Sequence, residues 1–134
     1  MKAEKFKHIF SGLDRAHGFY EFTETKISGK RDGQMRTLHK PPTLQMYQNH
    51  LDGKYPALGI VPIRDDATAT WGCIDIDEYP LDHKKILSKV RKYKLPLIMC
   101  ASKSFGAHLF LFSTKSQPAS LFQNKLKEIA SYLG

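Results

Sequence analysis

The segment TWGCIDID, residues 70–77, decides the fold, because isoleucine and aspartate alternate at its end. On a β-strand, side chains two residues apart share a face and lie about 6.5–7 Å apart along the chain. We therefore expect Ile74 and Ile76 to face a packed layer, while Asp75 and Asp77 face outward. Two carboxylates placed in this way suit hard divalent cations, which prefer oxygen ligands. The alternative is a strand end with solvated acids before a turn.

The segments that follow this strand indicate the fold class. Apolar residues at helical spacing predict a helix over residues 81–93, and apolar runs predict buried strands over residues 97–101 and 107–112. Pro118 can open a second amphipathic helix. The order strand, helix, strand, strand, helix predicts an α+β fold whose second half is an RRM-like, or ferredoxin-like, βαββα module without its last strand.

The N-terminal half predicts a smaller αβ module. Residues 28–42 are rich in turn-forming and basic residues and predict a hairpin or loop, with a short strand near residues 35–38. The other elements expected here are strands over residues 18–23 and 57–63 and a helix from Pro42 to Gly53. Together the two halves predict one domain, residues 1–134, made of modules at residues 1–66 and 67–134.

Composition restricts the class of protein. The chain has 134 residues, of which 41% are hydrophobic and 25% charged, as in globular proteins. No apolar run approaches the ~20 residues that span a bilayer, and the first residues lack the apolar core of a secretory signal. Cys73 and Cys100 have no CxxC spacing, which disfavours a disulfide framework and a cysteine zinc site. We therefore expect a cytoplasmic protein without membrane partners.

The charge distribution points to a polyanionic partner. The net charge is +8, and residues 83–127 contain ten basic residues and no carboxylate. Four acidic residues lie just before this basic region: Asp75, Asp77, Glu78 and Asp82. A compact acidic cluster in a basic field suits a metal site that acts on nucleic acid or nucleotides. The alternative is an ordinary lysine-rich domain.

A second group of polar residues lies in the segment SKSFGAHLFLF, residues 102–112. Hydroxyl groups, a lysine and backbone amides form a good anion cradle, and one turn is expected to combine Ser102, Lys103, Ser104 and Gly106. His108 begins the next strand, and strand pairing can bring this turn beside Asp75 and Asp77. The alternative is a polar hairpin turn with a structural histidine.

Several other kinds of site are not supported by the sequence. It contains no GxSxG nucleophile elbow, no Walker A motif and no HxxxH or Cys/His spacing for zinc. Rolling-circle nucleases need two histidines that alternate on one strand, and the segment around His108 offers one.

Taken together, these segments resemble the archaeo-eukaryotic primase superfamily, in its primase-polymerase branch of mobile elements and conflict systems. CIDIDEY, residues 73–79, is similar to the first motif of that superfamily, a DxD on the first strand of the RRM-like half. Residues 102–112 are similar to its second motif, in which a serine and a glycine-containing turn precede a histidine on a strand. Residues 9–20 and 47–63 also fit, and the resemblance extends over about residues 6–112.

The resemblance implies a fold and an activity. It implies an N-terminal αβ module packed on the RRM-like module, with DNA template, primer and nucleoside triphosphates as partners. It implies that Asp75 and Asp77 hold two Mg²⁺ or Mn²⁺ ions for template-directed nucleotidyl transfer, with His108 as a further catalytic residue. The nucleotide phosphates would contact the residues of the second motif: Ser102, Lys103, Ser104, Gly106 and His108.

The sequence departs from the superfamily pattern in two places. Phe105 stands where such turns often carry a small residue, as a tolerated variation or as a stacking surface for a base. The third motif, an aspartate on a late strand, has no counterpart after Asp77, which predicts the N-terminal part of a longer core. Such a chain would polymerise poorly alone and would offer an open sheet edge for self-association.

We also expect the basic residues near the hairpin to contact nucleic-acid phosphates: Lys30, Arg31 and Arg36.

The competing hypothesis is a non-catalytic RRM that binds single-stranded nucleic acid. KSFGAHLF, residues 103–110, is similar to the RNP1 pattern, but Ser104, Ala107 and His108 replace its glycine, second aromatic and aliphatic residues. The first strand carries aspartates where that module places an aromatic residue. Carboxylates on the sheet face would repel RNA unless a metal neutralised them, which favours the primase-polymerase hypothesis.

Overall fold

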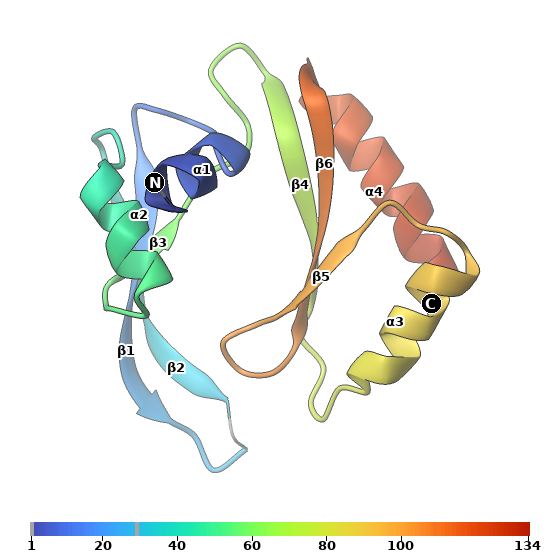
Figure 1. The fold of residues 1–134 in the computed structure, drawn as a ribbon. Helices are drawn as coiled ribbons and strands as arrows, with labels where there is room; N and C mark the ends of the chain where they lie inside the picture. Colours follow the sequence, from blue (N-terminus) through green and yellow to red (C-terminus); the bar gives the residue numbers. More distant parts are fainter. Residues whose placement is uncertain (1, 29) are drawn as a thin grey trace. The chain divides into compact units, whose positions relative to one another are not determined.

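The computed structural model describes residues 2–28 and 30–134 and has an α+β fold (Figure 1). It divides into two compact units, Met1–Ala67 and Thr68–Gly134. Each unit contains a three-stranded antiparallel sheet among the described residues. None of the helices in the described ranges has the length and apolar character that a membrane span requires.

The N-terminal unit is a β-hairpin extended by a short third strand and accompanied by two helices. Its sheet has the order β2-β1-β3, with Tyr20 of β1 opposite Met35 of β2. The elements in chain order are α1 (Lys2–Ile9), β1 (His17–Thr25), β2 (Arg31–Leu38), α2 (Leu44–Leu51) and β3 (Ala57–Gly59).

Packing between α1 and α2 supplies much of the apolar interior of this unit. The Tyr47 ring of α2 is buried and meets the Phe6 ring of α1 edge-on, with 6.1 Å between ring centroids. His50 stacks on Phe6 at 5.9 Å, and its Nδ1 accepts a hydrogen bond from the Leu58 amide at 3.1 Å. The Thr43 hydroxyl caps the start of α2. These contacts hold both helices and β3 together.

The N-terminal unit differs from the sequence prediction in three respects. The helix α1 was not predicted, because its segment is mostly polar. The strand expected over residues 57–63 ends at Gly59, since Pro62 lacks an amide donor and the Val61 carbonyl accepts instead from the Leu13 amide. The expected hairpin is present, but its second strand, β2, is longer than the strand expected near residues 35–38 and includes Arg31.

The C-terminal unit has the predicted order of elements, strand, helix, strand, strand, helix. Its sheet has the order β4-β6-β5, so β6 is the central strand and β4 pairs on one side only with a described strand. The elements are β4 (Thr68–Ile76), α3 (His83–Lys92), β5 (Ile98–Ala101), β6 (Ala107–Pro118) and α4 (Ala119–Leu133).

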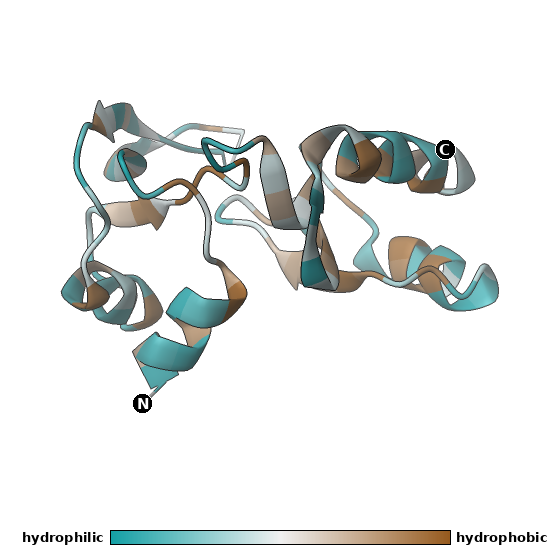
Figure 2. Cartoon of the chain, turned by 90° about the horizontal axis from the view of Figure 1, so that it is seen from above, coloured by the Kyte–Doolittle hydropathy of each residue, from teal (hydrophilic) through white to brown (hydrophobic). Residues whose placement is uncertain are grey.

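The two helices of this unit cover one face of its sheet. Hydrophobic residues alternate with hydrophilic ones along both helices (Figure 2). A Cβ at Gly72 would lie only 2.7 Å from the Leu126 side chain of α4, so residue 72 of β4 faces the helices. Ile74 and Ile76 pack on the same side, against two clusters whose buried members are Ala69, Val90, Leu109, Leu111, Phe122, Ile129 and Leu133.

Two predictions of burial in this unit are wrong. Residues 97–101 were expected to form a buried strand, but β5 is an edge strand, and Ile98 is 59% exposed because it points away from the helices. The helix predicted over residues 81–93 was expected to bury its apolar residues, Tyr93 included, but Tyr93 is the exposed C-cap of α3. The strand that begins at Ala107 is longer than expected and runs to Pro118.

Candidate functional site

Asp75 lies on the sheet face opposite the helices. It stands between Ile74 and Ile76, which face the core, and its side chain is 66% exposed. Strand register places Asp75 directly opposite His108 of β6, and the Asp75 Oδ1 and His108 Nε2 atoms are 3.5 Å apart. The period of two in the β4 sequence therefore brings an acidic residue and the expected motif histidine together at the end of two paired strands.

Asp77 lies just beyond the end of β4 and is held by a residue that the sequence did not single out. The Tyr79 hydroxyl donates a hydrogen bond to Asp77 Oδ1. This bond raises the pKa of the Tyr79 phenol, because a phenol proton shared with a carboxylate is harder to remove. Hydrogen bonding with the hydroxyl groups of Ser104 and Ser102 lowers the pKa of the same phenol. Tyr79 thus links Asp77 to the turn between β5 and β6.

This turn spans residues 102–106, as predicted, and its backbone is closely fixed. The Ser102 amide donates to the Gly106 carbonyl at 3.1 Å, and the Phe105 amide donates to the Ser102 carbonyl at 3.0 Å. His83, in the first turn of α3, donates from Nε2 to the same Gly106 carbonyl at 3.0 Å. A Cβ at Gly106 would lie 2.3 Å from the Ile76 carbonyl oxygen, so only glycine allows this turn to approach the end of β4.

The predicted anion-binding residues of the turn differ in their surroundings. Lys103 is exposed, whereas Ser104 is 4% exposed and lies beneath the turn surface. Ser102 and His108 are half-buried. The structure therefore gathers the hydroxyls of Ser102 and Ser104 around Tyr79, whereas Lys103 lies on the surface of the turn.

Aromatic side chains continue the sheet face beyond His108. The Phe110 ring lies 5.8 Å from His108, 6.1 Å from Trp71 and 6.0 Å from Phe112, measured between ring centroids. Cys73 lies opposite Phe110 in the register, and burial, more than the nearby Asp75 charge, raises the pKa of its thiol to about 11. This face therefore has an acidic end at Asp75 and, beyond His108, a row of aromatic side chains, which we call the aromatic row: Trp71, Phe110 and Phe112.

The carboxylates of Asp75 and Asp77 are of the kind that hard cations bind. Mg²⁺ is commonly held by one or two carboxylates, with waters and substrate phosphates completing its shell. Across residues 2–28 and 30–134, no group of three or more His, Cys, Asp or Glu side chains is placed to hold a metal ion. The residues present thus fit a cation that shares its ligands with a phosphate substrate better than they fit a closed protein site.

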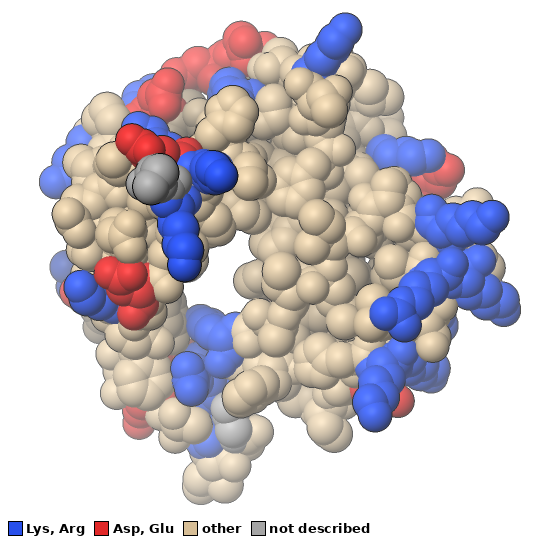
Figure 3. Space-filling model, in the orientation of Figure 1, with Lys and Arg blue, Asp and Glu red and all other residues tan. Residues whose placement is uncertain are grey.

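The basic residues lie in both units. Arg31 and Arg36 are exposed on β2, and Arg36 donates from Nη2 to Gln34 Oε1 at 3.2 Å. Lys30 is half-buried next to the start of β2. In the C-terminal unit, lysines and arginines gather over α3 (Figure 3). That helix covers the opposite face of the sheet from Asp75, and its N-terminal His83 contacts the turn at residues 102–106.

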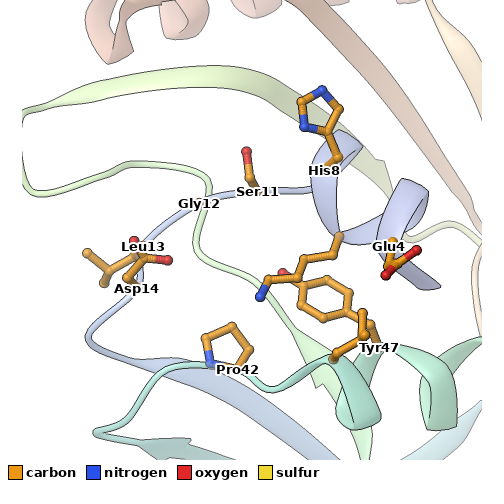
Figure 4. A pocket seen from close by; sticks show the side chains of 10 residues that line it. Glu4, His8, Ser11, Gly12, Leu13, Asp14, Pro42 and Tyr47 are labelled. Atoms are coloured by element: carbon orange, nitrogen blue, oxygen red, sulfur yellow. The ribbon is translucent and has the colours of Figure 1, made fainter. Parts of the chain in front are cut away.

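A separate pocket of about 490 Å³ lies within the N-terminal unit (Figure 4). The Tyr47 hydroxyl group belongs to its lining, and burial, followed by the negative charge of Asp14, raises the pKa of this phenol. Acidic and basic side chains both line the pocket, so its charge favours no single class of ligand. The lining consists of Glu4, Lys7, His8, Ser11, Gly12, Leu13, Asp14, Pro42, Leu44 and Tyr47.

A family model described as the archaeo-eukaryotic primase domain of the TOTE conflict system matches residues 13–133. The chain belongs to this family. A search of curated proteins gives no match. Membership confirms the resemblance drawn from the sequence and agrees with the α+β fold. At the level of the family, it indicates primase-like nucleotidyl transfer, with nucleotides and nucleic acid as ligands.

Sequence reasoning did not identify two residues of the site, Tyr79 and His83. His83 donates to the Gly106 carbonyl, 23 residues later, and the Tyr79 hydroxyl, which is bonded to Asp77, lies near Ser104. A tyrosine two residues after a DxD and a histidine at the start of a helix are unremarkable as sequence patterns. The available signal was proximity to the first motif, because Tyr79 is the last residue of segment 73–79 and His83 follows four residues later.

Proposed function

We propose that this chain is a metal-dependent, template-directed nucleotidyltransferase of the DNA primase-polymerase type. The observation that carries the proposal is that exposed Asp75 lies opposite His108, while Tyr79 links exposed Asp77 to the hydroxyl-rich turn at residues 102–106. Carboxylates repel a triphosphate unless cations lie between them, whereas hydroxyls and a lysine attract it. This combination suits a nucleotide that binds together with divalent ions.

In this proposal each residue of the site has a defined role. Asp75 and Asp77 hold two Mg²⁺ or Mn²⁺ ions, which when bound would neutralise charge on the phosphates and favour ionisation of the attacking hydroxyl. Tyr79 orients the Asp77 carboxylate. His108 contacts the triphosphate beside Asp75. The remaining phosphate contacts come from the turn: Ser102, Lys103, Ser104 and the backbone at Gly106.

The reaction joins the primer 3′-oxygen to the α-phosphorus of the incoming nucleotide, and pyrophosphate leaves. Protein side chains take no covalent part in this step, so the catalytic contribution of the chain is positioning and electrostatic stabilisation. DNA is the proposed template, and the basic residues near the hairpin are proposed to contact its phosphates: Lys30, Arg31 and Arg36.

The experiment is a paired binding and extension assay on the purified chain. We expect dNTP binding that requires Mn²⁺ or Mg²⁺, together with addition of nucleotides complementary to a DNA template. The Asp75→Asn/Asp77→Asn double variant is expected to lose both. Nucleotide binding of equal affinity with and without divalent cation, in the wild type and in this variant, would refute the proposal.

A non-catalytic, single-strand-binding module is the second candidate function, and the aromatic row favours it. Phe110 and Phe112 lie half-buried on one sheet face beside the buried Trp71, and aromatic side chains on that face of RNA-binding sheets stack on bases. Binding of single-stranded RNA or DNA without divalent cation, together with no metal-dependent nucleotide binding, is the result expected for that function.

A further inference from the structure

Phe105 occupies an unusual position at the exposed tip of the turn between β5 and β6. Its φ angle is +64°, in the left-handed region, and the residue is 68% exposed. Bulky L-residues rarely adopt this conformation, which glycine adopts without steric cost. Its neighbours on both sides, Ser104 and Gly106, are buried. The turn therefore holds a large aromatic side chain in solvent, in a conformation that favours glycine.

Core packing among the described residues of the C-terminal unit does not account for this side chain. Phe105 belongs to neither of the two core clusters of the C-terminal unit. Its backbone conformation is nevertheless imposed by three hydrogen bonds: Ser102 to Gly106, Phe105 to Ser102, and His83 to Gly106. Strained residues that are firmly held without contributing to core packing often have a functional role. For an exposed aromatic ring, a role that fits is stacking on the base of a nucleotide.

The position of Phe105 indicates which part of a bound nucleotide its ring would contact. Its neighbour Ser104 lies close to the Tyr79 hydroxyl, which is bonded to Asp77, and His108 follows three residues later. In the proposed function, this polar cluster takes the phosphates. A ring at the rim of the cluster is then available to the base at the other end of the nucleotide.

We propose that Phe105 stacks on the base of the bound nucleoside triphosphate and so increases affinity for purine over pyrimidine nucleotides. This inference rests on the proposed function. Stacking is sequence-tolerant because every base has a π-face, and it strengthens with ring area. The fixed turn presents the ring in one orientation, so little conformational freedom is lost on binding. Inorganic tripolyphosphate, which has no base, would gain nothing from Phe105.

The test compares Phe105→Gly, Phe105→Asn and Phe105→Trp with wild type, using dATP, dCTP and inorganic tripolyphosphate in the presence of Mn²⁺. Glycine and asparagine both tolerate the left-handed conformation, so these variants are expected to fold and to melt at a higher temperature. We expect them to bind dATP about tenfold more weakly, dCTP less so, and tripolyphosphate unchanged. Phe105→Trp should retain or improve dATP binding. Leu121→Ala, which removes an exposed apolar side chain from α4, is the matched control and should change none of these affinities.

Two outcomes would overturn the inference, and they are distinguishable. If the glycine and asparagine variants bind dATP as wild type does, or lose tripolyphosphate binding equally, Phe105 does not stack on the base, while the proposed nucleotide site stands. If the wild type binds neither dATP nor tripolyphosphate with Mn²⁺, the proposed function fails, and the role of Phe105 fails with it.

Discussion

Replacing Asp75 with asparagine separates the proposed metal-binding role of this residue from its contribution to folding. The Asp75 side chain is 66% exposed, and its partner, His108 Nε2, is 3.5 Å away and half-exposed. An exposed ion pair of this kind contributes about 0–1 kcal/mol. We therefore expect Asp75→Asn to change the free energy of unfolding by less than about 1 kcal/mol.

The expected effect on nucleotide binding is larger. A charged contact that is lost from a bound complex costs roughly 1.5–3 kcal/mol, which corresponds to an affinity loss of about 10- to 150-fold. Isothermal titration with dATP and Mn²⁺ measures this loss, and thermal unfolding measures stability. The neutral amide keeps the shape of the carboxylate, so the comparison isolates charge.

Glu128→Gln provides the matched control. Glu128 is an exposed carboxylate of the same unit, on α4, and it pairs with Lys125 at 3.0 Å. It should show the same small change in stability and no change in dATP affinity. The reasoning is refuted if Asp75→Asn binds Mn²⁺ and dATP as the wild type does, or if Asp75→Asn and Glu128→Gln weaken binding equally.

Four further predictions follow from individual groups. Ser102→Ala and His108→Ala should weaken triphosphate binding by about 10-fold or more and monophosphate binding less; equal losses would place both residues away from the terminal phosphates. Iodoacetamide at pH 8 should alkylate exposed Cys100 and spare Cys73, whose pKa of about 11 keeps it a thiol; peptide mass spectrometry showing equal labelling would contradict this. Burial lowers the pKa of His50 below its ordinary 6.5, so its contribution to stability is present above pH 6.5 and is lost as the pH falls through the lowered value. His50→Gln should therefore flatten the dependence of melting temperature on pH between 7.5 and 5, and an unchanged slope would exclude His50 as its source. The affinity of the chain for template DNA should fall steeply as the salt concentration rises, and less steeply when glutamates replace the basic residues near the hairpin: Lys30, Arg31 and Arg36. If the dependence of affinity on salt is unchanged in that variant, these residues do not contact the template.

The sequence predicted the parts of the fold that depend on periodicity. The alternation of isoleucine and aspartate correctly placed Asp75 outward, because a strand has a strict period of two. The turn with Ser102 and Gly106 was also predicted, since its residues favour turns. The burial of β5 was predicted wrongly because strand order, which makes β5 an edge, is not encoded in the composition of the strand itself.

The contacts that organise the candidate site could not be predicted in the same way. The bond from His83 to Gly106 depends on the start of α3 reaching the β5–β6 turn, and this position follows from the packing of the helix on the sheet. The proximity of Tyr79 to Ser104 has the same origin. Local patterns report which face a residue occupies, whereas contacts between distant segments require the tertiary structure.

The arrangement of these contacts also explains why a strained turn can persist beside an exposed acidic pair. The Gly106 carbonyl accepts hydrogen bonds from both Ser102 and His83, and Gly106 packs against the Ile76 carbonyl with no room for a Cβ. The turn is therefore fixed from the helix and from the strand at once, so the left-handed conformation of Phe105 cannot relax without breaking contacts elsewhere. On the other side, the strand register fixes Asp75 opposite His108. The residues proposed to bind a flexible, highly charged nucleotide are thus held by the rigid elements behind them, and such preorganisation lowers the entropy lost on binding.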